Sequence, residues 1–346
     1  MPFGLSLTFA TRFAAVEMNW RMDPLLTSVY TPEARPTFIT WKGYQRRSEV
    51  LAPLLDADVL FFPHVFRSKV LRPLDYLLKF IRTTVYLIRV RPPLVILQAP
   101  PLFAALAAIL TKTRYIVDVH NALIQSFWLN VPLTRTFIRH ATALIAHNVA
   151  MEAIVKETFP GSRAITISDP LSLISGGSIS RRDRDILVIC SFDYDEPITL
   201  LLDVVMALPE FTFTITADIQ RLPRKLRRAF VACSNVRLTG FLSTAAYHSV
   251  LCSSKVAVVL TTLPDVQPSG ACEALASNTP LIVTRSPMTE ALFGEWATLA
   301  DNSIESLVNA IRSVKDDPLV LDAYRDRWNE AVMRGIADLN ALLSIG

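Results

Sequence analysis

The sequence predicts an α/β protein built from two doubly wound, mostly parallel sheets. The chain has 346 residues, a length typical of two domains. Short apolar runs alternate with helical segments and short connections over residues 36–167, and the alternation resumes over residues 186–314. A stretch rich in Gly, Ser and charge separates the two halves at residues 172–185 and lacks periodicity, as linkers do. These observations favour two Rossmann-like domains joined by a linker.

The first half carries the pattern of a complete doubly wound sheet. Strands are expected at residues 37–41, 58–62, 94–97, 115–119, 143–146 and 164–167. Helices are expected at residues 45–55, 74–90, 102–110, 133–141 and 149–158.

The second half repeats the alternation. Strands are expected at residues 186–190, 211–216, 236–240, 256–260 and 281–283. Helices are expected at residues 198–208, 224–233, 244–251, 271–276, 304–311 and 319–343. We therefore divide the chain into a poorly defined segment (1–35), a first domain (36–171), a linker (172–185), a second domain (186–318) and a C-terminal helix (319–346).

Composition and motifs exclude several classes of protein. Hydrophobic residues make up 51% of the chain, enough for two cores. The four cysteines are scattered without a C-x-x-C pair, which favours a reduced, cytoplasmic compartment. Neither a G-x-G-x-x-G nor a G-x-x-x-x-G-K-[ST] motif occurs, so the sequence does not support a dehydrogenase or a P-loop enzyme. The first residues lack the basic and apolar regions of a signal peptide.

One uncharged stretch, residues 92–111, has the length of a membrane span. Two proline pairs, Pro92-Pro93 and Pro100-Pro101, interrupt helical hydrogen bonding within it. A buried strand followed by a packed helix accounts for the stretch better than a membrane span.

The most informative stretch covers residues 256–285, which read as strand, loop, helix and strand. Ser269 and Gly270 place backbone amides at the predicted helix start, where the helix dipole favours an anion such as phosphate. Glu273 follows in the first predicted turn and suits sugar or ribose hydroxyls, and Asp265 lies eight residues before it. The alternative is a polar loop with a glutamate that merely complements the helix dipole.

Two other strand ends carry polar residues. Asp118 and His120 end a buried strand on the same side, because side chains alternate along a strand. They are candidates for contact with a ligand at this sheet edge, or else a turn cap and a structural histidine. Gly43 lies in the first turn after a strand, where the backbone can approach a ligand closely. Arg46 and Arg47 follow it and would either hold a phosphate or face solvent, and we expect at least one to face solvent.

The second half resembles GT-B glycosyltransferases that carry a Glu-x7-Glu motif, of the family 4/1-like type. The segment Glu273-Ala-Leu-Ala-Ser-Asn-Thr-Pro-Leu-Ile-Val is similar to their small-residue helix and following strand. CSFDYDEPITLL and VRLTGFL precede it in the family order, and the resemblance covers residues 36–330. The chain departs from the pattern in having Asp265 for the first Glu and Asn278-Thr279 for the usual Gly. It also lacks the basic residue that many relatives keep after the Cys190 strand for diphosphate.

The resemblance implies a GT-B fold, with an acceptor domain and a nucleotide-sugar domain facing an interdomain cleft and the C-terminal helix packed near their junction. It implies catalytic roles for Asp118, His120 and Glu273, with Glu273 binding donor hydroxyls. It places the diphosphate at Ser269 and Gly270 and the nucleobase at Gly240 and Phe241. Asp265 and Gly43 complete the expected donor site.

Charge is unevenly divided between the halves. Residues 1–170 hold 19 Lys/Arg against 11 Asp/Glu, whereas the remainder holds 16 against 20. Basic residues interleaved with aromatic ones concentrate around residues 66–91, which favours docking on anionic lipid. No nucleic-acid motif accompanies them, so we expect no nucleic-acid partner.

The leading hypothesis is a cytoplasmic glycosyltransferase, peripheral on the inner face of the plasma membrane, that acts in bacterial-type surface glycan synthesis. It would move a sugar from a nucleotide-sugar donor to a lipid-linked or saccharide acceptor. The donor is a co-substrate, and we expect no cofactor and no metal, because protein groups can stabilise the leaving diphosphate electrostatically. The alternatives are a sugar-nucleotide epimerase of the same fold and a non-catalytic GT-B subunit that binds a partner or membrane.

Overall fold

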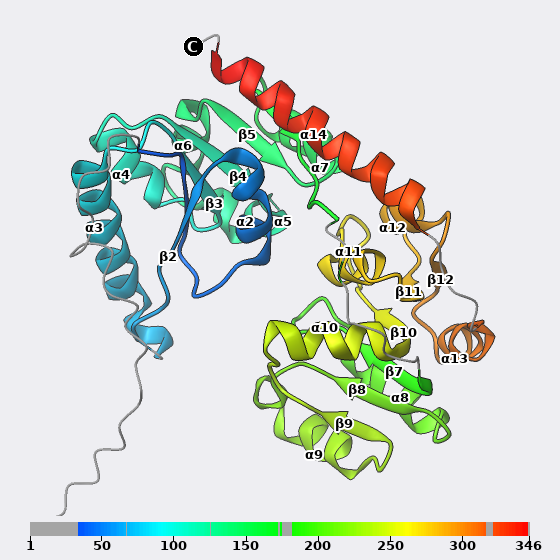
Figure 1. Ribbon diagram of the computed structural model, residues 1–346. Helices are drawn as coiled ribbons and strands as arrows, with labels where there is room; N and C mark the ends of the chain where they lie inside the picture. Colours follow the sequence, from blue (N-terminus) through cyan, green and yellow to red (C-terminus); the bar gives the residue numbers. More distant parts are fainter. Residues whose placement is uncertain are drawn as a thin grey trace, which may run out of the picture.

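The computed structural model describes residues 34–66, 68–124, 126–171, 174, 182–315 and 321–344. Within these ranges the chain forms two parallel sheets of six strands each (Figure 1). The first sheet consists of β1 (Thr37–Thr40), β2 (Asp58–Phe61), β3 (Val95–Ala99), β4 (Tyr115–Val119), β5 (Ala143–Ala146) and β6 (Ala164–Thr166). The second consists of β7 (Arg182–Val188), β8 (Thr212–Ile215), β9 (Val236–Leu238), β10 (Ser254–Val259), β11 (Leu281–Thr284) and β12 (Thr298–Ala300).

Helices connect the strands of each sheet. Those of the first domain are α2 (Arg46–Leu51), α3 (Arg72–Val90), α4 (Ala104–Leu110), α5 (Asn121–Ile124), α6 (Thr134–His140) and α7 (Val149–Thr158). Those of the second are α8 (Ile198–Ala207), α9 (Arg224–Ala232), α10 (Thr244–Ser253), α11 (Ser269–Ala276), α12 (Pro287–Phe293) and α13 (Ile304–Ser313). The long helix α14 (Asp322–Ser344) follows them.

The strand orders locate the ligand edges of the two sheets. The first sheet runs β2-β1-β3-β4-β5-β6 and the second runs β12-β11-β10-β7-β8-β9. The order reverses between β1 and β3 in the first sheet, and between β7 and β10 in the second. Ligands of such sheets bind beyond the carboxyl ends of the strands at this reversal. The loops after β1 and β7 are therefore the natural starting points for a site.

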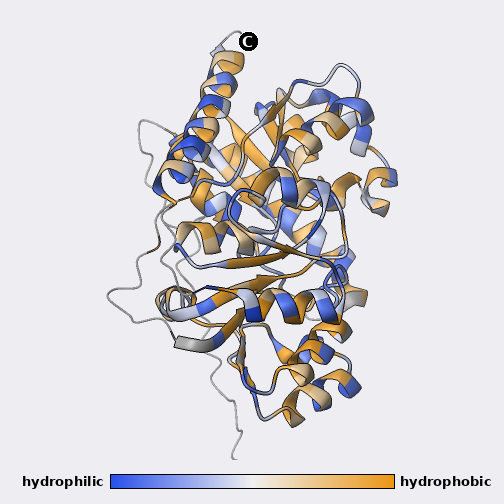
Figure 2. Ribbon diagram, turned by 90° about the vertical axis from the view of Figure 1, so that its right-hand side faces the viewer, coloured by the Kyte–Doolittle hydropathy of each residue, from blue (hydrophilic) through white to orange (hydrophobic). Residues whose placement is uncertain are grey.

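Each sheet is buried on both faces, as parallel sheets require. Figure 2 shows the central strands coloured as hydrophobic, while the surrounding helices mix both kinds of residue. In the first domain one core lies under α3, α4, α6 and α7, and a second lies between the sheet and α14. In the second domain one core lies under α8, α9 and α13, and the other under α10, α11 and α12.

Helix α14 contacts both domains (Figure 1). Near its start, Trp328 stacks on Phe293 of the second domain, with ring centroids 6.1 Å apart. The Trp328 indole nitrogen donates to the carbonyl of Asp169, at the end of the first domain, over 2.9 Å. Further along, Val332, Ile336 and Leu339 pack into the core of the first sheet. The helix thereby uses one apolar face on both domains.

The predicted fold class is confirmed. Strands β4 and β5 and helix α7 have the predicted bounds, and residues 92–111 form β3 and α4 rather than a membrane span. Within the described ranges, every helix falls short of the length or hydrophobicity that a membrane crossing requires.

Some boundaries were predicted wrongly. Strand β7 begins at Arg182, inside the predicted linker, because it pairs with Ser254 at the start of β10. Helix α12 and strand β12 were not predicted, although Ser286 and Pro287 form a recognisable helix start with a capping box. The segment 1–33 and most of the linker lie outside the described residues.

A close approach of α14 to β6 gives a stability prediction. A Cβ atom on Gly335 would lie 2.2 Å from the carbonyl oxygen of Thr166. Alanine normally stabilises a helix interior by roughly 0.5–1 kcal/mol relative to glycine. Here we expect Gly335→Ala to destabilise the protein by about 1–3 kcal/mol, the usual cost of overpacking.

Thermal unfolding of the two proteins measures this effect. Asn340→Ala, at an exposed position of the same helix, is the matched control and should raise the unfolding temperature slightly. An unfolding temperature for Gly335→Ala above that of the wild type would contradict the packing of α14 on β6.

Candidate functional site

The carboxyl edges of the two sheets meet at a junction crossed by side-chain contacts. Arg46, at the start of α2, places its Nε 3.1 Å from Oε1 of Glu273 on α11. Asn121, just after β4, donates from Nδ2 to the carbonyl of Asp265 in the loop after β10, over 3.4 Å. Both contacts join loops or helix starts that follow strands near the reversal points. The junction therefore gathers polar groups from both domains.

Glu273 is held at this junction from two sides. Besides its ion pair with Arg46, it accepts a hydrogen bond from the hydroxyl of Tyr247 on α10. Burial raises the pKa of Tyr247 well above its usual value, and the Glu273 charge raises it further, so Tyr247 stays a donor. Helix α11 begins at Ser269, so Glu273 lies in the second turn rather than the predicted first. The helix dipole therefore does not account for this carboxylate.

Arg47 forms a buried charge network in the first domain. Its Nε lies 2.9 Å from Oδ1 of Asp118, and its Nη1 lies 2.5 Å from Oδ1 of Asp169. Its Nη2 donates to the carbonyl of Ile167 over 2.7 Å. Burial alone would raise the pKa of Asp118, but the Arg47 charge, helped by His120, holds it well below the usual range. The sequence-based expectation that one arginine of this pair faces solvent is wrong, since Arg47 is buried and Arg46 half-buried.

His120 lies between this network and the junction. Its Nε2 is 3.1 Å from Oδ2 of Asp118 and 3.4 Å from Nε2 of Gln45. The side chain of His120 is 28% exposed, whereas that of Asp118 is fully buried. Asp118 can therefore act on a ligand only through His120, whose ring it orients. Since Gln45 and Arg46 are adjacent, one loop contacts both His120 and Glu273.

The remaining predicted donor residues lie at the edge of the second domain, except Gly43. Ser269 is exposed at the first position of α11, and Gly270 is buried behind it. A Cβ atom on Gly270 would lie 2.7 Å from Ile189, so glycine lets α11 approach the end of β7. Asp265 is half-buried, and its carbonyl accepts the Asn121 contact.

Gly240, Phe241 and Gly43 are placed on turns. Gly240 follows β9 with a φ of 64°, a left-handed conformation that favours glycine. Phe241 beside it is 80% exposed, which leaves its ring open to a planar ligand. Gly43 is exposed in the loop after β1. The contacts reported above do not include these three residues, and their roles in donor binding stay predictions.

Several buried polar atoms near the junction have no hydrogen-bond partner among the described residues. They are Arg46 Nη1, Gln98 Nε2, Asn121 Oδ1, Asn148 Nδ2 and Gln267 Oε1. Gln98 lies near the end of β3, and the others lie in the segments that follow β1, β4, β5 and β10, on the side where ligands of parallel sheets bind. Buried polar atoms in folded proteins almost always have a partner, from the protein, water or a ligand. This edge is therefore suited to a polar, hydroxyl-rich or anionic ligand.

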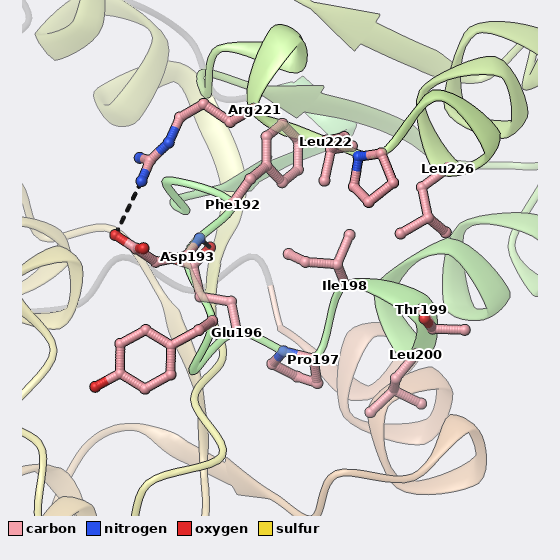
Figure 3. Close-up of a pocket in the computed structure, with 12 residues that line it drawn as sticks. Phe192, Asp193, Glu196, Pro197, Ile198, Thr199, Leu200, Arg221, Leu222 and Leu226 are labelled. Atoms are coloured by element: carbon pink, nitrogen blue, oxygen red, sulfur yellow. Dashed lines mark hydrogen bonds and ion pairs between the residues drawn. The ribbon is translucent and has the colours of Figure 1, made fainter. Parts of the chain in front are cut away.

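The loop after β7 is held by hydrogen bonds between its own residues. The carboxylate of Glu196 accepts hydrogen bonds from the Ser191 amide at 2.9 and 3.1 Å and from the Asp193 amide at 3.1 Å. Beside this loop lies a pocket of about 430 Å³ lined by Phe192, Tyr194 and Leu226 among others. Figure 3 shows Arg221 paired with Asp193 at one side of the lining residues, and the two groups lie 3.1 Å apart.

Sequence reasoning missed Tyr247, Gln45, Gln267 and Glu196. Gln45 has a local signal, since its side chain caps α2 by accepting from the Ser48 amide over 2.6 Å. Tyr247 shows no pattern that marks it, because only the folded chain brings it beside Glu273. Gln267 lies two residues before Ser269, but only the structure shows that its Oε1 is buried without a hydrogen-bond partner among the described residues.

Comparisons with known proteins agree with this fold. Residues 223–334 match the family model described as Glycosyl transferases group 1. No curated protein matches the chain in sequence. Among solved structures, the chain is similar to sucrose-phosphate synthase from Thermosynechococcus elongatus, with 14% identity, a TM-score of 0.62, and coverage of 91% of this chain and 98% of that one.

Two further structures have the same fold. Anabaena HepE in complex with UDP and glucose has 13% identity and a TM-score of 0.66, covering 90% of this chain and 100% of that one. A mutant of S. aureus TarM, in complex with Fondaparinux, alpha-GlcNAc-glycerol and UDP, has 14% identity and a TM-score of 0.58, covering 76% and 59%. At such identities the likeness establishes the GT-B fold. Together with the family match, it supports an enzyme of the glycosyltransferase class.

The Arg47 network gives a prediction about stability. Arg47→Met leaves Asp118 and Asp169 without their cation, and removing one partner of a buried ion pair costs about 3–5 kcal/mol. We expect the free energy of unfolding to fall by this amount in urea unfolding monitored by circular dichroism.

The same network predicts how stability depends on pH. Because the folded pKa of Asp118 is lowered, the contribution of Asp118 to the free energy of unfolding is present at neutral pH and declines as the pH falls below about 4.

The neighbouring substitution Arg46→Met is the matched control. Arg46 is half-buried at the junction, so its loss should cost much less than the loss of Arg47. Equal urea midpoints for the two variants would show that Arg47 does not hold the first domain together.

Proposed function

We propose that this chain, with its GT-B fold and glycosyl transferases group 1 segment, transfers a sugar from a nucleotide diphosphate donor to a lipid-linked or saccharide acceptor. The observation that carries the proposal is the junction itself. There Glu273 from the second domain meets Arg46, beside Gln45 and His120, from the first. Transfer between two substrates needs groups from both domains at one place, and the junction supplies them.

In the proposed site the second domain holds the donor. Glu273 accepts hydrogen bonds from donor hydroxyls, and Tyr247 keeps its carboxylate in place. The amides at the start of α11, Ser269 and Gly270, face the diphosphate, and the Gly240–Phe241 turn lines the nucleobase. Two complexes of the same fold contain UDP, which supports a nucleotide donor.

The first domain would contribute His120 at the transferred sugar. Asp118 accepts from the same ring and so fixes its orientation. A positioned imidazole can exchange a proton with the acceptor hydroxyl or stabilise charge at the sugar. Departure of the diphosphate is favoured by donors and cations already in place, which need no reorganisation during the reaction. The proposed transfer therefore requires no cofactor beyond the nucleotide-sugar.

The donor site is tested by Glu273→Gln. A thermal-shift screen with UDP-, GDP- and ADP-sugars first identifies the donor, since a ligand that binds the folded state raises the unfolding temperature. With that donor, the variant should lose about tenfold to a hundredfold in kcat/KM, because hydrogen bonds to a charged group contribute roughly 1.5–3 kcal/mol. Its unfolding temperature without ligand should change little.

The same assay separates the alternatives. Full activity of purified Glu273→Gln would remove this residue from the site. Release of free sugar without acceptor would favour an epimerase, and stabilisation by none of the nucleotide-sugars would favour a non-catalytic subunit.

We further propose that the acceptor is carried on a membrane and that helix α3 docks the enzyme there. The inward face of the helix combines polar residues with Tyr86 and Leu87 of the core, and its outward face is largely apolar. Asp75, Lys79 and Thr83 face inward and are buried, at 0%, 1% and 0% exposure. Lys79 donates to the carbonyl of Trp41 over 2.9 Å, and Thr83 accepts from the Trp41 indole over 3.1 Å.

The outward face of α3 and the turn before it carry an apolar ridge. The ridge consists of Val70, Leu71, Leu74, Leu77, Ile81 and Ile88, which are 41–85% exposed. Arg82 is half-buried on the same helix and Arg91 is exposed at its end, whereas Arg72 lies 3.5 Å from Asp75 of the inward face. An apolar ridge with flanking arginines suits an anionic lipid surface at the cytoplasmic side of a membrane.

The ridge corrects the expected composition of this face. Lys79 and Tyr86 belong to the basic and aromatic residues of segment 66–91 but are buried, and Tyr76 and Phe80 are half-buried. Leucine and isoleucine, rather than aromatic residues, form the exposed surface.

Vesicle sedimentation tests the docking. Wild-type protein should bind phosphatidylcholine vesicles that contain phosphatidylglycerol, and binding should weaken with salt because exposed charges are screened within about 8 Å at physiological ionic strength. The double variant Leu77→Gln/Ile81→Gln should lose most of this binding. The control Met206→Gln/Val231→Gln, at exposed apolar positions of the second domain, should bind as the wild type does.

Two outcomes would contradict lipid docking. One is equal binding to vesicles of phosphatidylcholine alone. The other is a dimer, detected by light scattering, that dissociates in Leu77→Gln/Ile81→Gln, which would assign the ridge to a second copy of the chain.

A further inference from the structure

The loop after β7 is built in a way that disfavours a phosphate group. Its amides at Ser191 and Asp193 both donate to the Glu196 carboxylate, and the Ser191 hydroxyl donates to the same group over 3.2 Å. Successive backbone amides form an anion-binding concavity. Here a carboxylate of the chain itself occupies that concavity. A diphosphate would have to displace it.

The charge of this loop also opposes an anion. Asp193, Asp195 and Glu196 lie within four residues of one another. Arg221 pairs with Asp193 at 3.1 Å, and both side chains are largely exposed, at 41% and 51%. One exposed arginine of this domain does not offset three carboxylates, and the other cation that interacts with Asp193, Lys42, comes from the first domain. Within the described residues, the loop after β7 therefore offers no cationic diphosphate site of its own.

A cation reaches the junction from the opposite domain instead. Arg46 follows the loop after β1, where the strand order of the first sheet reverses. Its Nε lies 3.1 Å from Glu273 Oε1, while its Nη1 is buried and has no hydrogen-bond partner among the described residues. Glu273 already accepts from Tyr247 through its other oxygen. The guanidinium thus has N–H groups without a hydrogen-bond acceptor. These groups lie where the nucleotide-sugar is proposed to bind.

We infer that Arg46 supplies the cation for the donor diphosphate across the domain junction. The inference rests on the proposed function. It assigns the positive charge that binds the diphosphate to the first domain. The planar guanidinium can hold two phosphate oxygens at once, a geometry that arginine offers and lysine does not. In the ligand-free protein its ion pair with Glu273 keeps both side chains in place. Donor binding then needs both domains, because the ribose meets Glu273 and the diphosphate meets Arg46.

The inference is tested by comparing nucleotides with their nucleosides. Isothermal titration calorimetry with UDP and uridine, GDP and guanosine, and ADP and adenosine gives the preference of the wild type for the diphosphate. Arg46→Gln should reduce that preference by about 10- to 100-fold, the range for losing one charge-assisted contact, and leave nucleoside affinity nearly unchanged. Arg46→Lys should retain part of it. Arg221→Gln, which removes the arginine of the β7 loop, is the matched control and should keep the full preference.

The outcomes distinguish this inference from the proposed function. If the wild type binds none of the nucleotides, the proposed function fails and the inference with it. If the wild type prefers the diphosphate and Arg46→Gln does too, or if Arg221→Gln loses the preference instead, the inference is wrong while the proposed function stands. Equal losses for nucleotide and nucleoside in both Arg46→Gln and Arg46→Lys would show a structural role only.

Discussion

The arrangement of the candidate site depends on the buried guanidinium of Arg47. It ties together three segments far apart in sequence, the start of α2, the end of β4 and the segment after β6. Two carboxylates and a carbonyl surround it, so its burial is compensated by charge and hydrogen bonds. Because α2 is fixed in this way, the residues just before and beside Arg47 are fixed too. Gln45 and Arg46 are thereby held at the edge of the sheet, facing His120 and Glu273.

The two domains present opposite charges to the junction between them. The first domain presents Arg46 and a network that keeps Arg47 protonated, whereas the second presents Glu273 and an acidic loop. Opposite charges on the two domains attract the domains to each other, and salt partly screens this attraction. A donor that carries both hydroxyls and an anionic diphosphate complements both walls. Recognition of such a donor would therefore be shared between the domains.

Buried hydrogen bonds in the first domain determine which face of helix α3 is exposed. The loops after β1 and β2 need partners for the Trp41 carbonyl, the Trp41 indole and the Val65 amide. Lys79, Thr83 and Asp75 supply them from the inward side of α3. Tyr86 and Leu87 pack beside them in the core, whereas Leu74, Leu77, Ile81 and Ile88 lie on the outside and form part of the ridge. One set of inward hydrogen bonds thus fixes both the helix position and the character of the exposed face.

The sequence by itself determined the fold class and most of its elements. Apolar runs such as residues 115–119 and 143–146 are typical of buried strands in a parallel sheet, and they form strands with those bounds. It also determined which loops end at the ligand edge, because strand ends can be read from hydrophobic periodicity. This placed Asp118, His120 and Glu273 at the carboxyl edges of their sheets, though it could not tell a buried carboxylate from an accessible one.

Only the tertiary structure decided which polar residues meet. Arg46 and Arg47 are adjacent and chemically identical, yet one is enclosed by Asp118 and Asp169 and the other reaches Glu273 in the opposite domain. Likewise, whether Glu196 faces solvent or its own loop amides depends on a turn that composition does not specify. Periodicity reports burial on one element at a time, whereas ion pairs between distant segments depend on how those elements pack. The physical reason is that charge pairing is set by distances in space, which the local sequence does not contain.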